Sequence, residues 1–216
     1  MPHPPNSPHK GQPILSAGES LETAKAAIIL IHGRGATAES ILSLVPEFDQ
    51  PGFAYLAPQA ANYTWYPNSF LMPIQSNEPG LSSGLAVIED ILAHVNTAGI
   101  PTEKVMLIGF SQGACLSSEF VARHAQRYGG LAALSGGVIG PDDTPRDYPG
   151  SLDGTQIFLG CSDVDFHIPK ERVLESADIF RKLGGEVTAR LYPNMGHTVN
   201  EDELSVVREM IAAIVQ

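Results

Sequence analysis

One stretch decides the fold prediction for this chain: Val105-Met106-Leu107-Ile108-Gly109-Phe110-Ser111-Gln112-Gly113. The apolar residues predict a buried strand, and the segment from Ala114 to Ala125 that follows is compatible with a helix. G-x-S-x-G between a strand and a helix is the nucleophile-elbow pattern, in which a sharp turn lifts the serine hydroxyl above the sheet. Such a turn drives the serine towards positive φ, and the glycines remove side chains that would collide there. A turn whose serine only caps the helix is the simpler interpretation, but the strand and helix on either side favour the elbow.

The length and charge of the chain exclude several classes of function. With 216 residues, 43% of them hydrophobic, the chain is expected to form one domain with a substantial core. Its formal net charge is −11, which makes nucleic acid and anionic membranes poor partners. No apolar run approaches the roughly 20 residues that span a bilayer, so no membrane insertion is expected.

The N-terminal segment differs in composition from the rest of the chain. Residues 1–13 are rich in Pro, Asn, Ser and His and contain no apolar segment, so they do not resemble a secretory signal. We expect a disordered tail, with His3 and His9 in solvent, followed by a single domain over residues 14–216. The chain has two cysteines, too few for a disulfide framework, and the default compartment is therefore the cytoplasm.

Strand and helix patterns alternate along this domain. Strands are expected over residues 14–17, 26–31, 53–57, 105–108, 130–134, 156–160 and 187–192, and helices over residues 37–48, 81–99, 114–125, 170–183 and 200–215. Asn200 and Glu203 resemble a capping box at the start of the last helix. The alternation predicts an α/β fold, a mostly parallel sheet with helices on both faces. Ligands in such folds bind beyond the carboxyl ends of the strands.

Residues 59–79 break the pattern. This segment combines three prolines with several large aromatic and apolar side chains. Irregular segments of about 20 residues are uncommon in compact domains and often form lids or binding loops. We expect Trp65 and Leu71 to contact substrate.

Two further strand ends carry reactive residues. Asp163, Asp165 and His167 follow the strand at 156–160, and His197 follows the last strand. With Ser111 they give the chain order Ser, Asp, His. A serine hydroxyl needs an imidazole to take its proton, and the imidazole needs a carboxylate to hold its tautomer. The pattern therefore predicts a Ser–Asp–His triad.

His32-Gly33-Arg34-Gly35, at the end of the strand at 26–31, fits an oxyanion hole. The glycines let the backbone approach a substrate, and the N–H of Arg34 could join that of Gln112. Each such donor stabilises a transition state by about 2.7–4 kcal/mol. A glycine-rich turn with His32 packed inside is the simpler alternative.

Cofactor and metal sites are not expected. Gly33, Gly35 and Ala38 fit a dinucleotide fingerprint, but the next strand ends at Pro58-Gln59 without the acidic residue that would hold a ribose. The alternation of Asp163, Asp165 and His167 suggests a metal clamp, yet no second cluster completes a coordination sphere.

The sequence resembles the phospholipase/carboxylesterase family of α/β-hydrolases, which includes the acyl-protein thioesterases. The resemblance covers nearly all of residues 26–215 and rests on separate motifs: His32-Gly33-x-Gly35, Ala57-Pro58, Gly109-Phe110-Ser111-Gln112-Gly113, Asp163-x-Asp165 and Gly196-His197. It implies an α/β-hydrolase fold and a hydrolase without a cofactor. It also implies Ser111 as nucleophile, His197 as base and Asp165 as the orienting acid.

The departures from the family pattern concern the acid and the substrate. The family motif is D-x-D-P-x-x-P, whose second Asp is catalytic; Asp165 lies four residues before Pro169, although Phe166 replaces the first proline. Asp165 is therefore favoured over Asp163. Arg34 stands where the thioesterases carry a small or apolar residue, and Trp65-Tyr66-Pro67 resembles bacterial carboxylesterase-like members. Both favour small carboxylic or aryl esters over long acyl-protein substrates.

The resulting hypothesis is a carboxylesterase-type serine hydrolase that acts on a small-molecule ester through an acyl-enzyme. A thioesterase and a hydrolase of cyclic esters such as dienelactones remain open with the same site. A ligand-binding protein on a hydrolase scaffold is the alternative of another class. The sequence leaves open the natural ester and the oligomeric state, including a homodimer.

Overall fold

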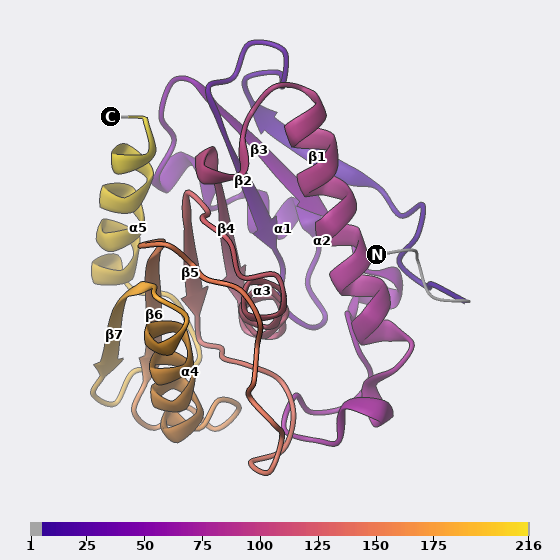
Figure 1. Cartoon of the computed structure of the whole chain (residues 1–216), viewed down its shortest axis with the longest axis vertical. Helices are drawn as coiled ribbons and strands as arrows, with labels where there is room; N and C mark the ends of the chain where they lie inside the picture. The colour runs from indigo at the N-terminus through magenta and orange to yellow at the C-terminus, as the bar shows by residue number, and fades with distance from the viewer. Residues whose placement is uncertain (1–5, 216) are drawn as a thin grey trace.

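A seven-stranded sheet forms the centre of the computed structural model, which describes residues 6–215 (Figure 1). The strand order is β1-β3-β2-β4-β5-β6-β7. β1 pairs antiparallel with β3, and every other pairing is parallel. The strands are β1 (Ile14–Gly18), β2 (Ala26–Ile31), β3 (Phe53–Pro58), β4 (Val105–Phe110), β5 (Gly130–Leu134), β6 (Gln156–Ser162) and β7 (Glu186–Tyr192).

Helices cover both faces of this sheet. α2 (Gly80–Thr97), α3 (Gln112–Arg123) and α4 (Lys170–Lys182) share one apolar core with the strands and lie in front of them in Figure 1. α1 (Ala38–Leu42) and α5 (Glu201–Ile214) share the core of the opposite face. The predicted α/β-hydrolase fold class is confirmed. Within residues 6–215 no helix is long and apolar enough to cross a bilayer.

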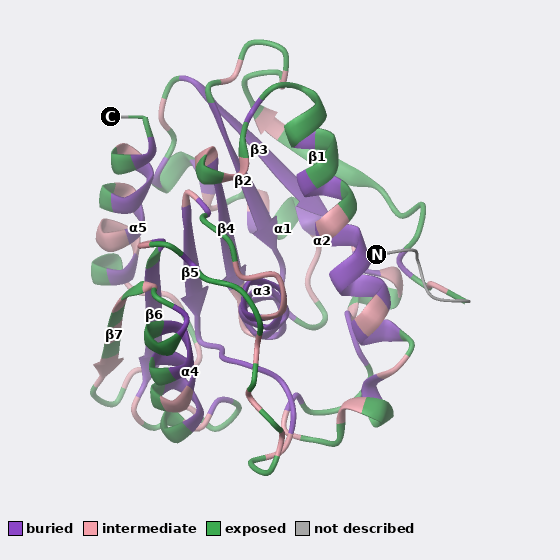
Figure 2. Ribbon diagram, in the orientation of Figure 1, coloured by how far each residue is buried: buried purple, intermediate pink, exposed green. Residues whose placement is uncertain are grey.

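The sequence of each strand reflects its place in the sheet. Every residue of β2 and β3 is buried, as Figure 2 shows by colour, because helices cover both faces. A strand covered on both sides needs an unbroken apolar run, and these two have one. β7 lies at the edge and alternates exposed with half-buried residues over its first five positions.

The connections create a switch point between β2 and β4. From β2 the chain passes to β3 on one side, and then crosses back to place β4 on the other side of β2. The loops after β2 and β4 therefore leave neighbouring strands at the same end of the sheet. Ligands of open α/β sheets bind at such a point.

The helix expected over residues 37–48 is only partly formed. Thr37 caps α1, which ends at Leu42, and a separate 3₁₀ turn spans Val45–Glu47. Pro46 provides the physical reason, because a proline has no N–H to bond the carbonyl four residues earlier, at Leu42, and its ring clashes with that carbonyl in an α-helix. The capping box at α5 is confirmed, since the Asn200 side chain accepts from Glu203 N at 2.9 Å and Glu203 Oε2 accepts from Asn200 N at 2.8 Å.

The prediction of a disordered tail with His9 in solvent is wrong for residues 6–13. The His9 side chain is 3% exposed. Its Nε2 donates to the carbonyl of Trp65 at 2.9 Å, and its Nδ1 accepts from the N–H of Ala61 at 3.0 Å. Its own N–H donates to Ser83 Oγ at 3.0 Å. These bonds satisfy a neutral imidazole and fasten the segment to the 59–79 region; residues 1–5, including His3, lie outside the described residues.

The buried His9 gives the first prediction. Burial lowers the pKa of His9 despite the opposing hydrogen bond to Trp65. The unfolded chain therefore binds a proton more readily, and the contribution of His9 to stability is lost as the pH falls below about 6.5. We expect His9→Gln to lower the free energy of unfolding by about 1–2 kcal/mol at pH 8 and by less at pH 5. Urea denaturation at both pH values measures this difference.

The matched control is His94→Gln, because His94 is exposed on α2. This variant should change the free energy of unfolding by no more than about 0.5 kcal/mol. An equal cost of His9→Gln at pH 8 and pH 5 would contradict a buried neutral imidazole.

Candidate active site

Ser111 sits on a strained turn between β4 and α3. Its φ is 54° and its ψ is −118°, a conformation that residues with a Cβ rarely adopt. A Cβ added at Gly113 would lie 2.1 Å from the carbonyl oxygen of Ile31, and one at Gly109 would lie 2.4 Å from that of Gly113. Both glycines are therefore required by backbone approaches that leave no room for a side chain.

The Ser111 hydroxyl does not cap α3, so the simpler interpretation of the turn is wrong. It lies 2.8 Å from Nε2 of His197, and Nδ1 of the same ring lies 2.7 Å from Oδ2 of Asp165. The three residues stand on loops after β4, β7 and β6. The structure thus brings together the serine, histidine and aspartate that the sequence singled out.

Asp165 is held as an anion beneath His197. Its side chain is fully buried, which by itself disfavours the charge. Hydrogen bonds from His197 and from the N–H groups of His167 and Ile168 outweigh that effect and keep the pKa of Asp165 below its ordinary value. The two N–H groups bind Oδ1 at 2.8 and 3.1 Å, which leaves Oδ2 for the imidazole. An acceptor oriented in this way favours the tautomer of His197 with its proton on Nδ1, in which Nε2 can accept a hydrogen bond from the Ser111 hydroxyl.

Asp163 has a different position. Its Oδ1 accepts from the N–H of Asn194 at 2.8 Å, and its own N–H donates to the carbonyl of Tyr192 at 3.1 Å. These bonds join the loop that carries Asp165 to the loop that carries His197. Asp163 is therefore a positioning residue between the two loops, a role that the sequence did not reveal.

Arg34 and Gln112 lie on the two loops at the switch point. A Cβ added at Gly33 would lie 3.4 Å from Cβ of Ser111, so the loop after β2 runs beside the elbow. Gln112 is the first residue of α3, and N–H groups in a first helical turn have no partner inside the helix. Both residues line the same cavity as Ser111.

The side chains of these two residues hold the 59–79 segment. Gln112 Oε1 accepts from Trp65 N at 2.8 Å, and its Nε2 donates to the carbonyl of Tyr66 at 2.8 Å. Arg34 Nη1 donates to the carbonyl of Pro67 at 2.9 Å. From the sequence we expected backbone roles for Gln112 and Arg34 and an effect of Arg34 on substrate preference, and no local pattern indicated these long-range bonds.

The prediction that Trp65 and Leu71 contact substrate is not supported by their positions. Trp65 is fully buried, and its indole N–H donates to the carbonyl of His32 at 2.9 Å. Leu71 packs against the core beside α2, and neither residue lines the cavity. An irregular loop needs its own apolar contacts to be held in place, and these two side chains supply them.

The cavity beside Ser111 has a volume of about 420 Å³. Residues next to the predicted site residues form much of its wall, among them Phe110 and His167. The ring centroid of Phe110 lies 5.0 Å from that of His197, and the ring centroid of His167 lies 4.9 Å from it. The lining residues are Gly33, Arg34, Ala36, Tyr66, Pro67, Asn68, Ser69, Phe70, Phe110, Ser111, Gln112, Cys115, His167, Ile168 and His197. For the lining residues that were not predicted, the sequence offered one indication, which was their position next to residues of the motifs.

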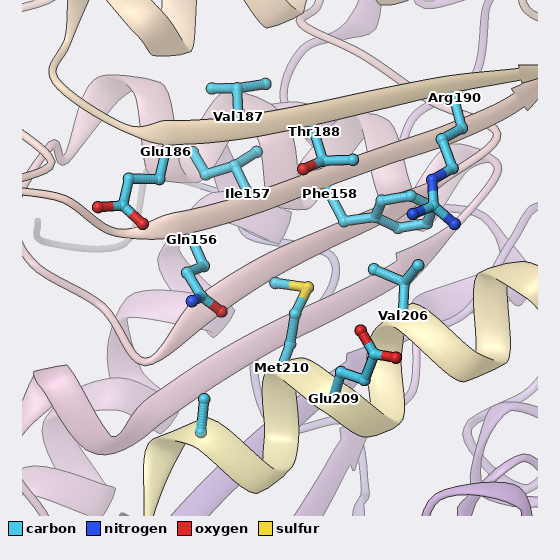
Figure 3. Close-up of a pocket in the computed structure, with 11 residues that line it drawn as sticks. Gln156, Ile157, Phe158, Glu186, Val187, Thr188, Arg190, Val206, Glu209 and Met210 are labelled. Atoms are coloured by element: carbon cyan, nitrogen blue, oxygen red, sulfur yellow. The ribbon is translucent and has the colours of Figure 1, made fainter.

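A second cavity, of about 410 Å³, lies between β6, β7 and α5 (Figure 3). Glu186, Arg190 and Glu209 line it together with Phe158 and Met210. None of its lining residues lines the cavity beside Ser111.

The cysteines and acidic residues offer little other chemistry. Burial raises the pKa of Cys115 to about 12, and burial with the nearby charge of Asp165 does the same for Cys161. Both thiols are free and stay protonated. Among residues 6–215, no group of three or more His, Cys, Asp or Glu side chains is arranged to hold a metal ion.

Comparison with known proteins places this chain among hydrolases. The model of a family described as Phospholipase/Carboxylesterase matches residues 15–215. A crystal structure of a phospholipase/carboxylesterase from Dyadobacter fermentans superposes with a TM-score of 0.90 at 39% identity, covering 94% of this chain and 97% of that one. Acyl-protein thioesterase 1 of Candida albicans is 28% identical over 90% of this chain and 94% of its own. The same-named protein of Debaryomyces hansenii is 26% identical over 89% and 93%.

The elbow geometry gives the second prediction. We expect Gly113→Ala to lower the free energy of unfolding by at least about 1–3 kcal/mol, because a new Cβ would overlap the backbone of β2. Gly196→Ala is the matched control: a Cβ there would meet nothing within 4 Å, so its effect should stay within about 0.5 kcal/mol. Urea denaturation measures both variants, and equal stabilities would contradict the close packing.

Proposed function

This chain belongs to the phospholipase/carboxylesterase family of hydrolases, and we propose that it is a serine hydrolase that cleaves carboxylic esters of small to medium acyl or aryl groups. The observation that carries the proposal is the hydrogen-bonded series from Ser111 through His197 to Asp165. Each bond is short, and the series ends at the wall of a cavity.

The proposed reaction has two halves. Ser111 Oγ attacks the ester carbonyl carbon while His197 Nε2 takes the hydroxyl proton. The tetrahedral intermediate collapses, the alcohol leaves with the proton from His197, and an acyl-enzyme remains on Ser111. Water then attacks the acyl group with His197 again as base, and the acid is released with Ser111 restored. The Asp165 carboxylate keeps the imidazole in the required tautomer and stabilises the imidazolium that forms in each half.

The proposed oxyanion hole consists of the N–H groups of Arg34 and Gln112. Support comes from their positions on adjoining loops on either side of the switch point, both beside Ser111. Neither depends on a flexible side chain for its placement, because Gln112 is in the first turn of α3 and Gly35 N–H donates to the carbonyl of Tyr63 at 2.7 Å. Donors fixed before the reaction need no reorganisation when the negative charge develops.

The size and lining of the cavity support small to medium substrates. Its volume of about 420 Å³ is near the lower end of the range for ligand pockets. Phe70, Phe110 and Ile168 provide apolar surface, while the segment from Pro67 to Ser69 adds polar groups. Such a pocket suits a short acyl or aryl group better than a long lipid chain.

A thioesterase is the second candidate, because the related proteins of Candida albicans and Debaryomyces hansenii are named acyl-protein thioesterase 1. Matched oxygen esters, thioesters and lactones of equal acyl length would separate a carboxylesterase from a thioesterase or a dienelactone-type hydrolase. A shift in melting temperature with ligand but no product would instead favour a binding protein.

The third prediction concerns Ser111. Wild-type protein should react with a fluorophosphonate, with the adduct on the peptide that contains Ser111, and Ser111→Ala should not react. Hydrolysis of a short 4-nitrophenyl ester should fall by about 10⁴–10⁶-fold in kcat, because the nucleophile is lost. Urea denaturation of the variant checks that the fold persists. Equal turnover by the two proteins would exclude this mechanism.

The fourth prediction separates the two aspartates. Asp165→Asn should lower kcat by about 10⁴-fold, because an amide cannot hold the imidazole in the reactive tautomer. Asp163→Asn should cost no more than about 10-fold, since an amide oxygen can still accept the bond from Asn194 N. Steady-state kinetics on one ester compares them, and a larger loss in Asp163→Asn would reverse the assignment.

A further inference from the structure

Within the part of the chain that the structure describes, no acidic residue lines the cavity beside Ser111. The chain as a whole carries 24 Asp and Glu residues against 13 Lys and Arg, yet none of the acids lines this cavity. Its lining residues include instead Arg34, which carries a cationic side chain, and the histidines His167 and His197. The cavity between β7 and α5 differs, because Glu186 and Glu209 both line it (Figure 3).

Asp165, the carboxylate that bonds to His197, already has its hydrogen-bond partners. Asp165 is fully buried behind His197 and binds that ring together with two backbone N–H groups. Its charge is therefore shielded from the cavity by the imidazole. An anion that enters the cavity meets no opposing carboxylate on the wall.

Arg34, which lines this cavity, carries a full positive charge and has no carboxylate partner among residues 6–215. Its Nη1 donates to Thr64 Oγ1 at 3.1 Å and to the Pro67 carbonyl at 2.9 Å, and its Nη2 donates to the Asn68 carbonyl at 2.6 Å. All three acceptors are neutral, and none of the ion pairs among the described residues includes Arg34. These bonds hold the guanidinium in place, so that little side-chain entropy is lost when a ligand binds.

The guanidinium keeps two donors for a ligand. Of its five N–H groups, three are used, and the remaining two are on Nε and Nη2. Among the described residues no acceptor occupies these two donors, and Arg34 is an exposed residue. A planar pair of N–H groups matches the two oxygens of a carboxylate.

We propose that the substrate is an ester that carries a carboxylate, and that Arg34 binds this carboxylate while the ester carbonyl lies at Ser111. The inference rests on the proposed function and narrows its substrate class. Arg34 then has two roles, with its backbone N–H at the oxyanion and its side chain at the substrate's anion. It would select anionic esters over neutral ones of the same shape.

The test uses two pairs of esters matched in shape and differing in charge. In the acyl pair, the 4-nitrophenyl monoester of adipic acid is compared with 4-nitrophenyl 6-methylheptanoate. In the alcohol pair, the butyrate of 4-hydroxyphenylacetate is compared with that of 4-isobutylphenol. We expect kcat/KM to be at least about 10-fold higher for the carboxylate member of one pair, as a charge-assisted bond provides. Added salt should reduce this ratio.

Variants then assign the preference to the guanidinium. Arg34→Gln should abolish the preference for the carboxylate ester. Arg34→Lys should retain part of this preference because the charge remains. Since Arg34 also holds the 64–68 loop, both substrates of a pair can slow together, and only their ratio reports the charge. Thr64→Val is the matched control, because it removes the hydroxyl that accepts from Arg34 Nη1 and also contacts Tyr66 and Gln112, yet it keeps the cation. Turnover of both substrates can change together, but their ratio should stay at the wild-type value.

The outcomes separate this inference from the function on which it rests. Hydrolysis of neutral esters with serine labelling, but with equal kcat/KM within both pairs, would overturn the carboxylate site and leave the hydrolase intact. A ratio that survives in Arg34→Gln would also overturn it. Absence of turnover on every ester would overturn both proposals. If Arg34→Gln does not fold, Arg34→Lys and the salt dependence of the wild type decide the question.

Discussion

The rest of the structure depends on the contact between the start of α3 and the end of β2. At Gly113 the helix backbone comes so close to the carbonyl of Ile31 that a methyl group would lie 2.1 Å from it. This approach forces the chain to turn sharply at Ser111, which adopts a φ of 54°. Because the backbone is held by packing on both sides, the strain of the turn is offset by the surrounding core. The hydroxyl is presented at the switch point, beside the loop that follows β2.

For the side chains of His197 and Asp165 to reach Ser111, the loops that carry them have to extend across the end of the sheet. β7 is three strands away from β4, a distance of about 14 Å at the usual strand spacing of about 4.8 Å. The loop after β7 bridges this distance and places His197 Nε2 at 2.8 Å from the Ser111 hydroxyl. Asp163 supports the crossing through its bond to Asn194 N, and Asp165 orients the ring from below. Two neighbouring aspartates thus have separate tasks, one in positioning loops and one in orienting the imidazole.

The 59–79 segment gives the cavity its shape and charge. It has little regular structure, yet hydrogen bonds attach it to the switch point. Its backbone bonds to the side chains of Gln112 and Arg34, and the buried indole of Trp65 donates to the carbonyl of His32. The N-terminal segment adds another attachment through His9. A loop held from several directions can provide a fixed wall, so the guanidinium of Arg34 occupies a defined position at the cavity. The same contacts that stabilise the loop therefore support the proposed selection of anionic esters.

Sequence alone determined the α/β architecture and the identity of Ser111 and His197 as candidates, because strand runs, the glycine-flanked turn and strand-end residues are local signals. Local signals left Asp163 and Asp165 both open, and the resemblance to a known family favoured Asp165. The sequence did not reveal that Trp65 is core, that His9 is buried, or that Asp163 joins two loops. Each of these facts depends on partners distant in the sequence: His9 bonds to a carbonyl 56 residues away, for example. Local patterns record which face of a strand is apolar and where a chain can turn. Only the folded chain decides which loops meet, since that depends on how helices pack across the whole sheet.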